Sequence, residues 1–283
     1  MAYFIPDGGI AGIRSLAQTW READVTLFLS SEEFSRGGGP GGRVDMALLH
    51  SIFDGFEAVQ VLCLLRSQWQ FLQSVYLEIS RSRPPPPPLA LLETALTHGM
   101  VDGLWCDYNG LIDDLKTGFD PKNFCMMSFD RAMLRPDGII GAVLDFLGVA
   151  LLPEDRQRIT AYRANRSPQP LSTWASFAVA GGQMPSDALQ AAARTAWDLE
   201  FGPERKGCLF TRRELDVLRL RFVPANARLP CALPWRAPGT DTIFRDDLSA
   251  DFWTRLARRI YFDQAGPSPL RTSVNTTKEG VTG

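Results

Sequence analysis

The sequence is poor in lysine and histidine, and this scarcity excludes several kinds of site. Its only lysines are Lys116, Lys122, Lys206 and Lys278, and its two histidines are His50 and His98. A metal centre built from histidine is therefore not expected. The five cysteines are scattered and never form a Cys-x-x-Cys pair. This pattern predicts buried thiols in a reducing compartment and neither a disulfide framework nor a structural zinc site.

The sequence also lacks a charge excess and a long apolar run. A formal net charge of −2 argues against a general binder of nucleic acids or membrane surfaces, which would be strongly basic. The longest apolar segment, residues 138–152, contains Asp145 and is too short to cross a bilayer. No basic stretch followed by an apolar run opens the chain, so no signal peptide is expected. We expect a cytoplasmic protein without a membrane span or a nucleic-acid partner.

Strand-like and helix-like segments alternate along the chain. Short apolar runs predict buried strands at residues 25–30, 59–65 and 124–128. Apolar residues at helical spacing predict amphipathic helices at residues 11–23 and 138–149. This alternation predicts an α/β fold with a mainly parallel central sheet.

We expect residues 1–263 to form a single domain, because 45% apolar content suffices for a large core. Beyond residue 185 the pattern is helical. Residues 264–283 are polar and poor in aromatics, which predicts a disordered tail. The glycine-rich run at residues 37–42 has no lysine and no following Ser or Thr, so it is interpreted as a flexible surface loop.

Arg66 follows the second predicted strand, residues 59–65. Gly, Asn or Asp at this position would allow the chain to turn with less conformational strain. Ser67 and Gln70 after it form a Ser-x-x-Gln pattern, which predicts a capping box at the start of a helix. Ser74 lies seven residues past Ser67, about 10 Å along the same helix face. Arg66 and Ser74 could thus hold one phosphate together, beside a helix N-terminus that favours anions.

A second interpretation needs no ligand. Arg66 would pair with a carboxylate such as Asp54 or Glu78, and Ser74 would be a small packing residue. Spacing alone favours this second interpretation.

Several segments, in the same order, resemble sulfotransferases. An arginine at a strand end with a serine eight residues later resembles the segment that binds the 3′-phosphate of 3′-phosphoadenylyl sulfate. The resemblance covers roughly residues 20–170, more loosely to 250, and rests on "LLRSQWQFLQSVY", "VTLFLSSEEFS", "NFCMMSFDRAML", "VLDFLGVALLPED" and "RANRSP".

This resemblance implies a three-layer, P-loop-like sulfotransferase fold and a role for each matched residue. Arg66 and Ser74 would bind the 3′-phosphate of the co-substrate 3′-phosphoadenylyl sulfate, with no metal. Glu32 would be the catalytic carboxylate that takes the proton of an acceptor hydroxyl, and Glu33 is the alternative. The acceptor would be a carbohydrate or a similar hydroxyl compound.

The sequence departs from the family in one respect. A Lys-x-Gly-[Thr/Ser]-[Thr/Ser] loop should lie near the N-terminus, and no such pattern occurs. We therefore expect the N-terminal strand, loop and helix of the family to be absent. Losing such a stabiliser of the leaving group costs about 100- to 1,000-fold in rate. Two hypotheses follow: a sulfotransferase, or a non-catalytic truncated relative that binds the nucleotide or a partner protein.

Overall fold

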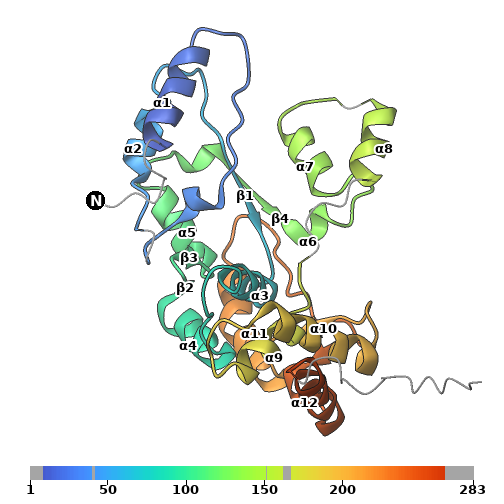
Figure 1. Ribbon diagram of the computed structural model, residues 1–283. Helices are drawn as coiled ribbons and strands as arrows, with labels where there is room; N and C mark the ends of the chain where they lie inside the picture. The colour runs from blue at the N-terminus through green and yellow to red at the C-terminus, as the bar shows by residue number, and fades with distance from the viewer. Residues whose placement is uncertain (1–8, 40–41, 151, 162–166, 265–283) are drawn as a thin grey trace, which may run out of the picture.

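The computed structural model describes residues 9–39, 42–150, 152–161 and 167–264, and these form a mixed α/β chain dominated by helices (Figure 1). The helices of the first half are α1 (Gly9–Trp20), η1 (Glu32–Ser35), α2 (Met46–Ser51), α3 (Gln68–Ile79), α4 (Pro88–His98), α5 (Tyr108–Leu115), η2 (Pro121–Asn123) and α6 (Phe129–Ala132). Those that follow are α7 (Gly138–Phe146), α8 (Pro153–Ala161), α9 (Pro170–Val179), α10 (Asp187–Phe201), α11 (Arg212–Asn226), η3 (Arg245–Asp247) and α12 (Ala250–Gln264). The strands are β1 (Val61–Leu65), β2 (Met100–Val101), β3 (Leu104–Trp105), β4 (Phe124–Ser128), β5 (Gly207–Cys208) and β6 (Ile243–Phe244).

The longest strands, β1 and β4, form a parallel pair. Their register runs from Val61 opposite Phe124 to Leu65 opposite Ser128. This confirms a strand within residues 59–65, a strand at residues 124–128 and their parallel arrangement. Their predicted burial is wrong, because only Leu65 and Ser128 of these two strands are buried and Leu64 is 37% exposed. The shorter pairs are β2–β3, which is antiparallel, and β5–β6, which is parallel. Because β1 and β4 end at the same level, the residues that follow both strands meet at one edge.

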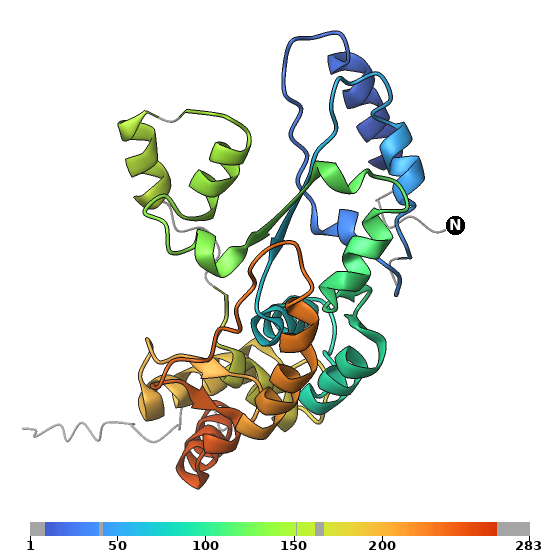
Figure 2. The ribbon, with the colours of Figure 1, turned by 180° about the vertical axis from the view of Figure 1, so that it is seen from behind.

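The strand predicted at residues 25–30 is wrong. This segment is irregular in the structure, and the Val25 and Phe28 side chains are 50% and 47% exposed. Figures 1 and 2 both show it, in blue, descending beside the chain that enters β1. No strand among the described residues pairs with it. Strand preference of apolar, β-branched residues depends on packing against a neighbouring strand, and none is supplied here.

The first of three hydrophobic cores joins α3, α4 and α11. Leu72 and Tyr76 of α3 are at most 1% exposed, and they pack in one cluster with Leu91 of α4 and Phe222 of α11. The apolar residues of α3 that recur at spacings of three and four, Leu72, Val75, Tyr76 and Ile79, are all buried. A continuous apolar stripe therefore fixes the orientation of α3 beneath the end of β1.

Two further cores flank the first. Met46 of α2, Leu65 of β1 and Leu111 of α5 belong to the second, which covers one face of the parallel sheet. Trp197 of α10 and Phe252 of α12 belong to the third, among helices α9, α10 and α12. Figure 2 shows these last helices together at the lower end of the molecule. The helical pattern predicted beyond residue 185 is thus confirmed.

Helix α7 lies outside all three cores. The predicted apolar helix at residues 138–149 forms, but of α7 only Gly141 and Ala142 are buried, and Ile140 is 43% exposed. In both views α7 and α8 stand apart from α1 and α2, across the β1–β4 pair.

The glycine-rich run, which composition predicts to be a flexible surface loop, is described at residues 37–39 and 42, and Gly37 in it is packed against other parts of the chain. The Gly37 amide donates to the carbonyl of Gly103 at 2.9 Å. A Cβ atom at Gly37 would lie 2.4 Å from Nε1 of Trp105, so only glycine allows this approach. The first half of the run is therefore packed on the β2–β3 turn.

The C-terminal prediction is only partly covered by the described residues. Residue 264 closes helix α12, and the rest of the predicted tail, 265–283, lies outside the described residues. The single domain expected over residues 1–263 stays a prediction. None of the described helices is long and apolar enough to cross a membrane.

Candidate functional site

The site lies where the chain passes from β1 into α3. Leu65 ends the strand, Arg66 follows it, and Ser67 is the N-cap residue of the helix. The hydroxyl of Tyr108, from α5, donates to the carbonyl of Arg66 at 2.8 Å. Tyr108 is 4% exposed, so this contact anchors the turn from a packed helix.

The structure brings the predicted pair Arg66 and Ser74 together. One terminal nitrogen (Nη1) of Arg66 donates to Oγ of Ser74 at 2.8 Å, and this hydroxyl donates to the carbonyl of Gln70 at 2.9 Å. The guanidinium also lies over the ring of Phe129, 4.2 Å from its centroid. Neither Asp54 nor Glu78 pairs with Arg66 among the described residues, and the carboxylate that acts most strongly on its charge is Asp130. The interpretation that needs no ligand, with a carboxylate of the chain facing Arg66, therefore stays a prediction.

Burial lowers the pKa of the Arg66 guanidinium, and the nearby carboxylate of Asp130 opposes that shift. Arginine nevertheless keeps its charge in proteins. Its Nε atom is buried and has no hydrogen-bond partner, and the same is true of the Ser67 hydroxyl, whose residue is 1% exposed. A cationic donor and a hydroxyl thus remain unsatisfied at the start of one helix, which is unusual for buried polar groups.

The predicted capping box is wrong, because Asp130 takes its place. The Ser67 side chain makes no capping hydrogen bond. The side-chain amide of Gln70 is taken in the orientation that satisfies its hydrogen bonds. In this orientation its nitrogen donates to both carboxylate oxygens of Asp130 at 3.0 Å. The Ser67 amide points to the same carboxylate at 3.5 Å, and Arg236 pairs with it at 3.2 Å. An acid of the chain itself therefore occupies the position where the helix N-terminus favours an anion.

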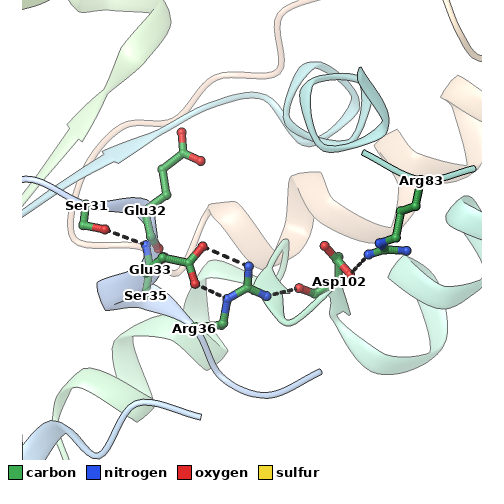
Figure 3. Close-up of polar contacts among 7 residues, drawn as sticks. All are labelled: Ser31, Glu32, Glu33, Ser35, Arg36, Arg83 and Asp102. Carbon is green, nitrogen blue, oxygen red and sulfur yellow. Dashed lines mark hydrogen bonds and ion pairs between the residues drawn. The ribbon is translucent and has the colours of Figure 1, made fainter. Parts of the chain in front are cut away.

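The two neighbouring acids, Glu32 and Glu33, have different surroundings (Figure 3). Glu33 holds Arg36 through two contacts, at 2.5 and 3.0 Å. The Glu32 side chain is exposed and points away from this pair, and its carboxylate has no partner among the described residues. The negative charge of Glu32 also raises the pKa of the Arg66 guanidinium, with a smaller effect than that of Asp130. Of the two acids, Glu33 is thus the one held in an ion pair within the described part of the chain.

Arg36 connects this segment to the β2–β3 turn. Its pKa is raised, chiefly by the hydrogen bond from its guanidinium to Glu33. It also donates to the carbonyl of Asp102 at 2.5 Å, and the Asp102 side chain pairs with Arg83 (Figure 3). The ion pair between Glu33 and Arg36 thus fixes the position of the segment that carries Glu32.

Two of the lysines form surface ion pairs, and the cysteines form no disulfide. Lys116 and Lys122 are surface residues paired with Asp113 and Asp120, at 3.0 and 2.8 Å. All five cysteines are free thiols. Within the described ranges no group of three His, Cys, Asp or Glu side chains is placed to hold a metal ion.

Sequence reasoning missed Asp130, Arg236 and Tyr108. A signal for Asp130 was present, because it lies two residues past a predicted strand, as Ser67 does, and parallel strands end at one edge. Arg236 comes from a loop and Tyr108 from a separate helix, and no local pattern marks either residue.

No protein-family model matches this chain, and no curated protein matches it.

Proposed function

We propose that the protein binds 3′-phosphoadenylyl sulfate at the end of β1 and transfers its sulfuryl group to a hydroxyl of a carbohydrate or similar acceptor. Arg66 and Ser74 would hold the 3′-phosphate, and Glu32 would act as the base. The proposal includes the three-layer sulfotransferase fold, of which the parallel pair β1–β4 would be the central part.

The contact between Arg66 and Ser74 carries the proposal. A phosphate placed there would receive hydrogen bonds from the guanidinium and from the serine hydroxyl, and charged hydrogen bonds of this kind are strong. These residues fit a phosphate, although the Asp130 carboxylate beside them adds a negative charge that the ligand must tolerate.

Each residue would have a defined part in the transfer. The acceptor oxygen bonds to sulfur while the bond from sulfur to the 5′-phosphate oxygen breaks, and adenosine 3′,5′-bisphosphate leaves. Glu32 takes the hydroxyl proton, for which its exposed and unpaired carboxylate is suited. Arg66 and Ser74 fix the nucleotide so that sulfur meets the acceptor in line.

A second candidate function is nucleotide binding without transfer. It is favoured by the surface ion pairs of Lys116 and Lys122, which leave neither lysine as a free cation for the leaving phosphate. A labelled-sulfate assay separates the two candidates, since both predict nucleotide binding and only the first predicts labelled product.

Calorimetry with adenosine 3′,5′-bisphosphate tests the site. We expect Arg66→Ala to weaken binding by about 1.5 to 3 kcal/mol, roughly 10- to 150-fold in Kd, the usual worth of a charged hydrogen bond. Arg81→Ala is the matched control, because Arg81 is exposed and, among the residues that the structure describes, forms an ion pair with Glu78 alone, near the far end of α3. Equal affinity of Arg66→Ala and the control, with both variants folded, or equal affinity for AMP, would refute the proposal.

A further inference from the structure

A cavity of about 300 Å³ lies next to the candidate site, at the carboxyl end of β4. Residues of β4, α6 and α7 surround it, together with residues 231–232. Ser128 lines it and is the register partner of Leu65, the residue before Arg66. The cavity therefore opens at the same edge of the parallel sheet, which is where α/β proteins bind ligands. It shares no lining residue with the Arg66–Ser74 contact.

Its lining combines an apolar wall with positive charge. Met126 and Met127 come from β4, Ala132 from α6 and Ala142 from α7. Methionine side chains are flexible and polarisable, so they adapt to ligands of different shape. The volume suits a small molecule of one or two rings.

The charged residues of the lining are Arg131 and Arg135, and no carboxylate from the described part of the chain lines the cavity. Arg135 is neutralised, because it pairs with Asp137 at 3.0 Å and with Asp145. The guanidinium of Arg131 has no hydrogen bond or ion pair within the described ranges. One uncompensated positive charge thus lies beside the apolar wall.

We propose that this cavity binds a small amphipathic anion. Its apolar body would lie against Met126, Met127 and the alanines, and its carboxylate, sulfate or sulfonate would pair with Arg131. This proposal goes beyond the proposed function and does not depend on it, because it needs neither the nucleotide nor Glu32.

Two fluorescent probes with a similar anilinonaphthalene frame test the proposal. The anionic probe is 8-anilinonaphthalene-1-sulfonate, and the neutral probe is N-phenyl-1-naphthylamine. We expect Arg131→Gln to weaken the anionic probe about 5- to 10-fold, the range of a charge contact at a partly exposed site, and to leave the neutral probe unchanged. Arg213→Gln is the matched control, since Arg213 is exposed on α11 and lines no part of this cavity.

A second variant tests the cavity itself. Ala232 lines it and is exposed, so Ala232→Trp can fill the space without overpacking a core. We expect this variant to weaken both probes at least 10-fold. The proposal is overturned if Ala232→Trp leaves both probes unchanged, or if Arg131→Gln affects the anionic probe no more than Arg213→Gln does. An equal loss of both probes in Arg131→Gln would overturn it as well.

Discussion

Glu32 and Glu33 are adjacent in the chain, but their side chains have different surroundings. Glu33 faces Arg36, whose side chain is only 10% exposed, and the two form a fork-like pair. Glu32 faces away from that pair and keeps an unpaired carboxylate (Figure 3). Loss of Glu33 would leave a buried guanidinium without its carboxylate, whereas loss of Glu32 would disturb no described contact of its side chain.

This difference predicts unequal effects of the two amide substitutions on stability. We expect Glu33→Gln to lower the free energy of unfolding by about 1 to 3 kcal/mol, and Glu32→Gln to change it by less than about 0.5 kcal/mol. Urea unfolding of both variants measures these values. If the sulfotransferase proposal holds, Glu32→Gln abolishes labelled-sulfate transfer while the protein stays folded. Equal stability losses in the two variants would contradict the division of roles.

At the scale of elements, the loop after η1 is fastened to the β2–β3 turn. The Gly37 amide and the Arg36 guanidinium both donate to carbonyls of that turn, at 2.9 and 2.5 Å. Gly37 also lies against the ring of Trp105. These contacts hold the segment that carries Glu32 next to the rest of the site.

We expect Gly37→Ala to lower the free energy of unfolding by about 1 to 3 kcal/mol, because the new methyl group would overlap the Trp105 ring. Gly12→Ala is the control. A Cβ atom at Gly12 meets nothing within 4 Å, and alanine favours a helix, so this variant should gain about 0.5 to 1 kcal/mol. Thermal unfolding followed by circular dichroism compares them. A neutral Gly37→Ala would show that the loop is not tightly packed on Trp105.

At the scale of the whole molecule, two thiols and two phenols are buried in the first two hydrophobic cores. Burial raises the pKa of the Cys106 and Cys208 thiols to about 12. Burial, with smaller effects of Cys125 and Cys231, does the same for Cys63. The pKa values of the Tyr76 and Tyr108 hydroxyls are also raised, chiefly by burial. The folded state therefore holds these protons more tightly than the unfolded state does.

This predicts alkaline unfolding with a defined pH range. Below the unfolded thiol pKa, near 9, the stabilisation is complete, and it is lost as pH rises towards 12. The free energy of unfolding should fall by at most about 1.4 kcal/mol per pH unit for each thiol. Urea unfolding from pH 8 to 12 measures the slope, and Cys208→Ala should reduce it although its starting stability is lower. A flat profile above pH 9 would contradict the prediction.

The sequence by itself determined β1, β4 and α3, because each depends on a local apolar pattern. It also placed Arg66 and Ser74 on one side of the chain, since one helix and its entry turn set their separation. It failed at residues 25–30, whose strand preference needs a partner strand. It failed again at the capping box, where a distant acid outcompetes the local bond.

Only the tertiary structure decided what surrounds these residues. Asp130, Arg236 and Tyr108 reach the turn at Arg66 from separate elements, and their contacts join residues 42 to 106 positions apart in the chain. The same folding leaves the Glu32 carboxylate without a described partner while Glu33 is paired, and it forms the open cavity beside Arg131. Local propensity depends on neighbours within a few residues, whereas the charge and burial of a site depend on which distant segments pack around it.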